Sequence, residues 1–147
     1  MKTVKNELLF VLLFSIASIV QAQKVNDADV PQAVKTTFKS KCPQAASAKW
    51  EKEDGNYEAH YSMGKMEMTC VINPAGVYVQ SETAINASEL PKPAADYLQK
   101  KMPGQKVTEA AKITDAAGKV TYEAEVKNTD YTFDGKGNFL KQEADND

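Results

Sequence analysis

The chain has 147 residues and a formal net charge of −2, with 18 basic against 20 acidic side chains, and every basic residue is a lysine. This balance lacks the clustered positive charge that binding to nucleic acid or to an anionic membrane surface requires. Without arginine the chain also lacks the planar guanidinium fork that grips phosphate or carboxylate at two points. We therefore expect no nucleic-acid partner.

The first 22 residues have the pattern of a cleavable signal peptide. Two lysines precede an apolar run from Leu8 to Val20, and Val20-Gln21-Ala22 supplies the small residues of a cleavage site. The run is well short of the roughly twenty residues that a helix needs to cross a bilayer. We therefore expect a periplasmic or secreted protein, cleaved after Ala22 and left with no membrane anchor.

Beyond residues 23–29, which we interpret as a disordered leader, the sequence repeats at a spacing of about sixty residues. Each copy opens with a proline in the first helical turn and closes at a proline that cannot continue the helix. This pattern predicts helices over residues 31–41 and 91–101. Apolar side chains recur every four residues along both helices. They are Val34, Phe38 and Cys42 in the first copy, and Ala94, Leu98 and Met102 in the second.

After each helix the pattern changes to the strict alternation and frequent turns of antiparallel strands. The expected strands cover about 46–53, 57–63, 66–72 and 77–83, then about 106–114, 119–127, 129–133 and 138–144. Alternation gives each strand one apolar face for the helices and one polar face for water. The sequence thus predicts an α+β fold of two tandem helix-plus-four-strand antiparallel units, 30–84 and 85–147. Together they form one sheet with two helices on one face.

The arrangement of these two units resembles the PepSY-like family of small exported proteins, which is also described as beta-lactamase-inhibitor-like. The resemblance rests on Tyr57-Glu58-Ala59, its echo Tyr122-Glu123-Ala124, and the final hairpin Phe133-Asp134-Gly135-Lys136-Gly137. It spans residues 30–143. It implies a non-enzymatic exported domain that binds another protein through its sheet, with inhibition of that protein as one form of binding. No inhibitory residue can be carried over to this chain.

The sequence offers little material for catalysis. It holds one histidine and none of the short motifs that mark hydrolases, zinc proteases or phosphate-binding loops. Several glutamates on the polar strand faces could form an acid-base pair, but alternation makes them ordinary solvated strand charges. They are Glu51, Glu53, Glu58, Glu123 and Glu125. We expect no enzymatic activity and no cofactor.

Cys42 and Cys70 are candidates for a disulfide, because an exported chain meets oxidising conditions. Cys42 occupies the helix-end position of Met102, and Cys70 the strand position of Tyr131, so the two should touch where helix packs on sheet. A bridge would stabilise the fold by roughly 3 kcal/mol on the chain-entropy estimate. The alternative is two buried thiols that pack as small hydrophobic groups.

A run of soft donor residues suggests a second function, a carrier of Cu(I) or of a small ligand. The run consists of His60, Met63, Met66, Met68 and Cys70. Alternation turns Met66, Met68 and Cys70 toward the helices but His60 away from them. Core methionines that fill gaps are therefore the simpler interpretation, and we predict no metal site.

The open sheet face is the main candidate for binding a protein or peptide. If Val79 and Leu140 point to the helices, Tyr78 and Phe139 point away from them, and exposed aromatic side chains are typical of protein-binding surfaces. Alternation places further candidates around this pair. They are His60, Glu58, Val71, Glu125 and Thr132. The alternative to a binding surface is that the two aromatics are isolated surface residues, or that a loop covers them. Trp50, aligned with Ile113, is expected in the core, and the sequence names neither the target nor the oligomeric state.

Overall fold

The computed structural model describes residues 22–144, which form one nine-stranded antiparallel sheet and two α-helices. Apart from Ala22, the expected signal peptide lies outside the described residues. The helices are α1 (Gln32–Lys41) and α2 (Lys92–Lys101), each preceded by a short 3-10 turn, η1 (Asp27–Asp29) or η2 (Ala87–Glu89). The strands are β1 (Gln23–Val25), β2 (Lys49–Glu53), β3 (Asn56–Met63), β4 (Met66–Ile72), β5 (Tyr78–Ala84), β6 (Glu109–Asp115), β7 (Val120–Glu125), β8 (Thr129–Asp134) and β9 (Phe139–Ala144).

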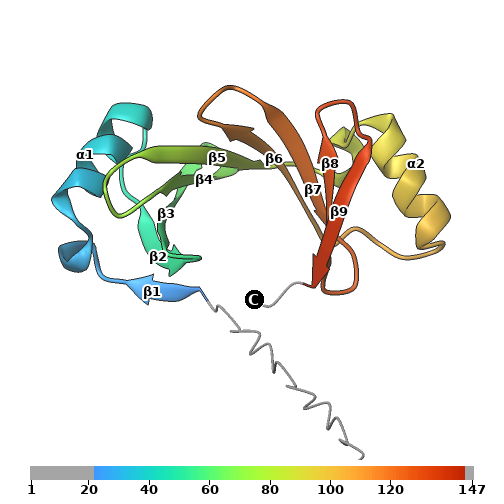
Figure 1. Cartoon of the computed structure of the whole chain (residues 1–147), viewed down its shortest axis with the longest axis horizontal. Coiled ribbons are helices and arrows are strands. Elements are labelled where there is room, and N and C mark those ends of the chain that lie inside the picture. Colours follow the sequence, from blue (N-terminus) through green and yellow to red (C-terminus); the bar gives the residue numbers. More distant parts are fainter. Residues whose placement is uncertain (1–21, 145–147) are drawn as a thin grey trace, which may run out of the picture.

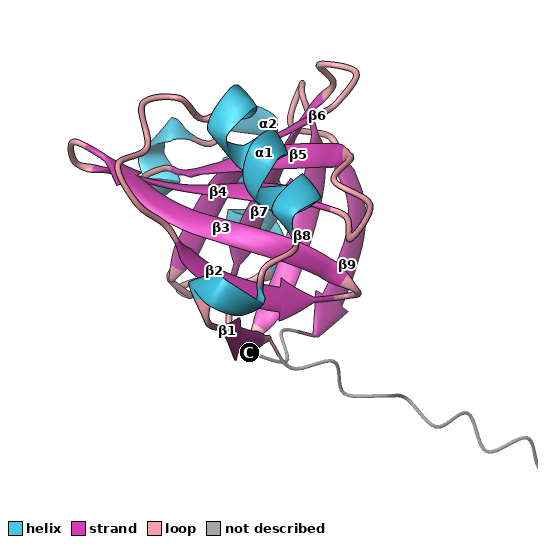
Figure 2. Cartoon of the chain, turned by 90° about the vertical axis from the view of Figure 1, so that its left-hand side faces the viewer, coloured by secondary structure: helices cyan, strands magenta, loops and turns pink. Residues whose placement is uncertain are grey.

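Every strand pairs with its neighbours in the chain, so the sheet order is β1 to β9 without a crossover. Figure 1 shows the sheet bent into an arch, with β1–β3 in one leg and β7–β9 in the other. The two helices lie on the outer flanks of this arch, and Figure 2 shows α1 crossing the outer face of the strands. The expected α+β fold, with both helices on one face of a single sheet, is confirmed. No helix within residues 22–144 is long and apolar enough to span a membrane.

The ninth strand is β1, which was not expected. Residues 23–29 form β1 and η1 instead of a disordered leader, because the backbone of β1 pairs with β2 and Val25 packs on the core beside Trp50. The strand β5 lies beside β6 as β1 lies beside β2. Each structural unit therefore begins with the strand before its helix, and β5 both ends the first unit and begins the second.

The first core lies between α1 and the sheet. Its buried members are Val30, Val34, Phe38, Trp50, Ala59, Tyr61, Cys70 and Ile72. Phe38 meets the rings of Trp50 and Tyr61 edge to face, with centroids 5.3 Å and 5.6 Å apart. Aromatic pairs of this geometry add to the free energy gained from burying their apolar surface. Trp50 is 5% exposed, as expected of a core residue.

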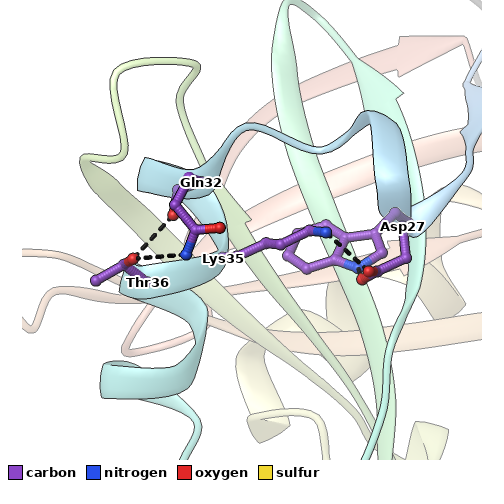
Figure 3. Close-up of polar contacts among 5 residues, drawn as sticks. Asp27, Gln32, Lys35 and Thr36 are labelled. Carbon is purple, nitrogen blue, oxygen red and sulfur yellow. Dashed lines mark hydrogen bonds and ion pairs between the residues drawn. The ribbon is translucent and has the colours of Figure 1, made fainter.

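Asp27 links η1 to this core (Figure 3). Its carboxylate accepts hydrogen bonds from Lys35 Nζ at 2.8 Å and from the Trp50 indole nitrogen at 3.2 Å. The hydrogen bond from Lys35 is the main reason that the pKa of Asp27 lies below its usual value. The buried indole thus keeps a hydrogen-bond partner, which a buried polar group requires.

The second core, under α2, is built from smaller side chains. Its members are Leu90, Ala94, Leu98, Ala124, Val126, Tyr131 and Phe133. Strand register shows that one pair of positions expected to be equivalent in the two units, Trp50 and Ile113, is not. Trp50 pairs with Ala59 as Ala110 pairs with Ala124, so Ala110, not Ile113, takes the place of Trp50. The second unit also has a groove of about 500 Å³ beside α2, bordered by Leu98 and Val126.

Candidate binding face

Two β-bulges decide which side chains face away from the helices. Between β4 and β5 the register shifts, so that Ile72 pairs with Tyr78 while Val71 pairs with Gln80. Val79 is the extra residue that a bulge inserts into one strand. Because paired residues share a face, Tyr78 lies with buried Ile72 on the helix side. Its ring packs on the first core, and the Lys41 ammonium lies 5.3 Å from the ring centroid.

The second unit repeats the bulge between β8 and β9. Phe133 pairs with Phe139 and Thr132 with Lys141, which leaves Leu140 as the extra residue, 51% exposed. Phe139 stacks on Tyr97 of α2 at a centroid distance of 4.6 Å. It therefore also lies on the helix side of the sheet.

The prediction that Tyr78 and Phe139 point away from the helices is therefore wrong. It assumed uninterrupted alternation, and one inserted residue in each unit reverses the face of the side chains on one side of the insertion. The same insertions remove Val79 and Leu140 from the regular helix-facing rows to which they were assigned.

The other five candidates do share the open face, the concave side of the arch. Cross-strand register places Glu58 beside Val71, His60 beside Thr69, and Thr132 beside Glu123. Glu125 pairs with Asp130 on the same face. Val71 is only 4% exposed, so its side chain offers little free surface for a partner. That these residues contact a partner stays a prediction.

The concave face encloses an open groove of about 1450 Å³, and its lining is strongly acidic. On the β2–β4 side the acids are Glu51, Glu53, Asp54, Glu58 and Glu67. On the side formed by β5–β9 they are Glu82, Glu109, Glu123, Glu125, Asp130 and Glu143. His60 also lines the groove, and no lysine does. Eleven carboxyl groups thus share a single hollow.

His60 lies among the carboxylates of β2 and β3. Its Nδ1 is 3.0 Å from the Thr69 hydroxyl, while its Nε2 is 3.5 Å from Glu58 and 3.7 Å from Glu51. A protonated imidazole at this place would form ion pairs with both carboxylates. His60 is therefore in contact with carboxylates of two neighbouring strands.

Glu123 is the acid most affected by its surroundings. Burial raises the pKa of its carboxyl group to about 7, and the negative charges of Asp130, Glu82 and Glu143 act in the same direction. Lys141, which pairs with Thr132 on the neighbouring strands, opposes them. A buried carboxylate close to like charges binds its proton more tightly for these two reasons.

The basic charge lies mainly elsewhere. The two helices carry Lys35, Lys39, Lys41, Lys92, Lys100 and Lys101, and Asp96 is the one acidic residue of either helix. Since the helices lie on the convex side, that side carries a cluster of basic residues. Strand register also places Lys24, Lys49 and Lys141 on the concave face, where Lys141 forms an ion pair with Glu143, but the groove itself is lined by acids. The small net charge of the chain conceals this separation.

The remaining candidates lie on the helix side of the sheet. Cys42 and Cys70 both belong to the first core region, and both are free cysteines in the structure. Met63 and Met68 pack against that core, whereas Met66 is 50% exposed. Within residues 22–144, no three histidine, cysteine or acidic side chains come together so as to hold a metal ion.

A bent antiparallel sheet with helices on its convex face, built from two tandem units, defines the class of fold. The family model described as "Putative beta-lactamase-inhibitor-like, PepSY-like" matches residues 18–76 and 72–141, and the chain belongs to this family in two tandem copies. These matches begin before residues 30 and 85, where we expected the units to start.

Two solved structures illustrate the likeness. One, from Bacteroides eggerthii and described as a "putative periplasmic" protein, has a TM-score of 0.68 and 19% identity, covering 78% of this chain and 88% of that chain. The other, a BLIP-like protein from Bacteroides fragilis, has a TM-score of 0.60 and 18% identity, covering 80% and 87%. At such identities the likeness shows a shared fold. No curated protein matches the chain in sequence.

Proposed function

We propose that this protein is an exported, non-catalytic binding module that captures a positively charged segment of another protein in its concave groove. The observation that carries the proposal is the lining of that groove by eleven acidic side chains and no lysine. Export is supported by the N-terminal pattern of the sequence and by the periplasmic description of a protein with the same fold. The absence of catalysis is supported by family membership.

The size of the groove favours a protein segment over a small molecule. Small-molecule pockets commonly enclose roughly 300–1,000 Å³ and bury most of their ligand. The groove here is larger, at about 1450 Å³, and is open to solvent. An extended, lysine-rich or arginine-rich loop or terminus would match both its open shape and its charge.

Electrostatics would contribute to both affinity and orientation. The carboxylates in the groove repel one another, and a cationic segment would relieve that repulsion while charge complementarity speeds encounter. The lysines of α1 and α2 would repel the same segment from the convex side. A cationic partner would therefore be guided to the concave face.

Inhibition is a narrower version of this proposal. It would follow if the captured segment borders the active site of an enzyme, and its support is the beta-lactamase-inhibitor-like description of the family. Sharing a fold does not establish a shared target.

A peptide-binding assay tests the proposal. We expect a fluorescent peptide of alternating lysine and serine to bind the purified protein, with affinity falling about tenfold or more between low salt and 0.5 M salt as charges are screened. The double variant Glu58→Gln/Glu125→Gln should weaken binding at least about fivefold, because it removes one groove charge from each leg of the arch.

The matched control removes two acids from the other side of the molecule. Glu89 lies in η2 and Asp96 in α2, outside the groove, so Glu89→Gln/Asp96→Asn should bind the peptide as the wild type does. Equal weakening by both double variants, or equal binding of an uncharged serine peptide, would refute the proposal. Concentration-dependent dimerisation abolished by 0.5 M salt would instead indicate that the basic helices of a second copy occupy the groove.

A further inference from the structure

The two cysteines of the chain form a second chemical site, on the opposite side of the sheet from the groove. Cys42 caps the C-terminal end of α1, where its backbone N–H donates to the Phe38 carbonyl at 2.8 Å. Cys70 lies in β4 with its side chain fully buried in the first core. The Cys42 side chain is half-buried and so keeps a path to solvent.

The two side chains are close neighbours already. Cys70 is a buried member of the first core, and Cys42 packs against that same core. In keeping with this geometry, burial raises the pKa of the Cys70 thiol, and the neighbouring Cys42 raises it further. The Tyr61 hydroxyl donates a hydrogen bond to Cys42 Sγ at 3.3 Å.

The site belongs to the first unit alone. Strand register makes Tyr131 the counterpart of Cys70, since Cys70 pairs with Ala59 and Tyr131 with Ala124. Met102 caps α2 as Cys42 caps α1. The second unit holds the same contact with side chains that cannot form a disulfide.

We propose that Cys42 and Cys70 are a redox pair that closes into an intramolecular disulfide in a fixed order, with Cys42 reacting first and Cys70 resolving. The oxidant is a disulfide, either of a thiol-disulfide oxidoreductase or of a small molecule. The order follows from access, because an incoming disulfide can reach Cys42 at the helix end but cannot reach Cys70 beneath it.

The reaction proceeds in two exchange steps. The Cys42 thiolate attacks one sulfur of the oxidant, whose S–S bond breaks, and the leaving thiolate takes up a proton. The mixed disulfide on Cys42 then receives the Cys70 thiolate, which displaces the second half of the oxidant as a thiol. Two protein thiols are oxidised and one external disulfide is reduced to two thiols.

The closed bridge would tie the end of α1 to the middle of the sheet. It would constrain the unfolded chain between residues 42 and 70 and so raise the melting temperature of the oxidised protein, by about 10 °C for a domain of this size. Because the groove lies on the other face, peptide binding should be equal in the two redox states. Failure of the bridge and failure of the proposed function can therefore be distinguished.

Oxidation of the reduced, purified protein by glutathione disulfide, followed by mass spectrometry after denaturation and alkylation, tests the order. The wild type should lose both alkylatable thiols and carry no glutathione. Cys70→Ser should accumulate one glutathione on Cys42, because no resolving thiol is present. Cys42→Ser should keep an unmodified Cys70 while folded, at least about tenfold less reactive than Cys42 in the other variant.

The wild-type experiment does not depend on the folding of either variant. Two alkylatable thiols remaining in the wild type after prolonged oxidation would overturn the bridge. Glutathione accumulating at Cys70 of Cys42→Ser as fast as at Cys42 of Cys70→Ser would overturn the order. A melting temperature that is the same before and after oxidation would contradict the closed bridge.

Discussion

Glu123 offers a direct test of the electrostatics of the groove at the scale of one residue. Its pKa in the folded protein is raised to about 7 from an ordinary value of 4.5, so the folded state holds the proton more tightly than the unfolded state. The group therefore stabilises the fold only while it is protonated. As the pH rises from about 4.5 through 7, this contribution is lost, because the ionised carboxylate faces Asp130, Glu82 and Glu143.

Glu123→Gln should remove this pH dependence. A neutral amide avoids the repulsion at every pH, so the variant should exceed the wild type in free energy of unfolding by about 2 kcal/mol at pH 8 and match it near pH 4.5. Urea denaturation at the two pH values measures the difference. Glu109→Gln, an exposed acid on the rim of the groove, serves as the control and should show no such divergence. Equal stability of Glu123→Gln and wild type at pH 8 would contradict the burial of this carboxyl group.

Trp50 is the residue on which the first core depends most. Trp50→Ala should lower the free energy of unfolding by about 3–5 kcal/mol, since it leaves a cavity beside Phe38 and deprives Asp27 of a hydrogen-bond donor. Thermal or urea unfolding measures the loss. Trp50→Phe keeps most of the packing and should cost less than half as much. A loss below about 1 kcal/mol for Trp50→Ala would show that the second unit, with Ala110 at this position, carries the stability of both.

At the scale of elements, the two turns before the bulged strands are built around equivalent glycines that touch the helices. Gly137 has φ of +85°, and a Cβ there would lie 2.8 Å from Pro91 Cβ and 3.0 Å from the Ala94 backbone nitrogen. The turn thereby fixes β9 against the start of α2. Gly76 has the same relation to Ala33 in α1.

Gly137→Ala should therefore be more harmful than an ordinary substitution of a turn glycine. Gly64 supplies the matched control, because it also has a positive φ, of +67°, yet a Cβ there would meet nothing within 4 Å. Gly64→Ala should cost about 1 kcal/mol of backbone strain, and Gly137→Ala at least about 1 kcal/mol more because of the clash. Denaturant unfolding of the two variants gives the comparison. Equal costs would mean that the turn moves freely away from α2.

Sequence periodicity was sufficient to predict the helices and most of the strands. It was insufficient to predict which face of the sheet the side chains near the bulges occupy. The helices begin and end within one residue of the expected bounds, because prolines and the apolar stripe mark them. Tyr78 and Phe139 were assigned to the wrong face, since an inserted residue leaves no signature in alternation alone. The strand β1 was not predicted, because α1 separates it in the sequence from its partner β2. A strand of only three residues is also too short to show an alternating pattern.

At the scale of the whole molecule, the arch converts scattered glutamates into one site. Each strand from β2 to β9 contributes one or two acids to the concave face. Alternation alone made these acids ordinary solvated charges, as we predicted for Glu51, Glu58 and Glu123. Curvature brings the two legs face to face and gathers eleven acids around one groove. The cue in the sequence was the scarcity of lysine at those positions, but the bend of the sheet cannot be inferred from alternation.

The central claim, that the concave face receives a cationic segment, is tested most directly by mapping backbone amide chemical shifts during titration with the lysine-serine peptide. The account predicts saturable shifts at amides of β2, β3, β7 and β8, with those of α1 and α2 unmoved. Shifts confined to the helices, or an absence of shifts up to millimolar peptide at low salt, would contradict it.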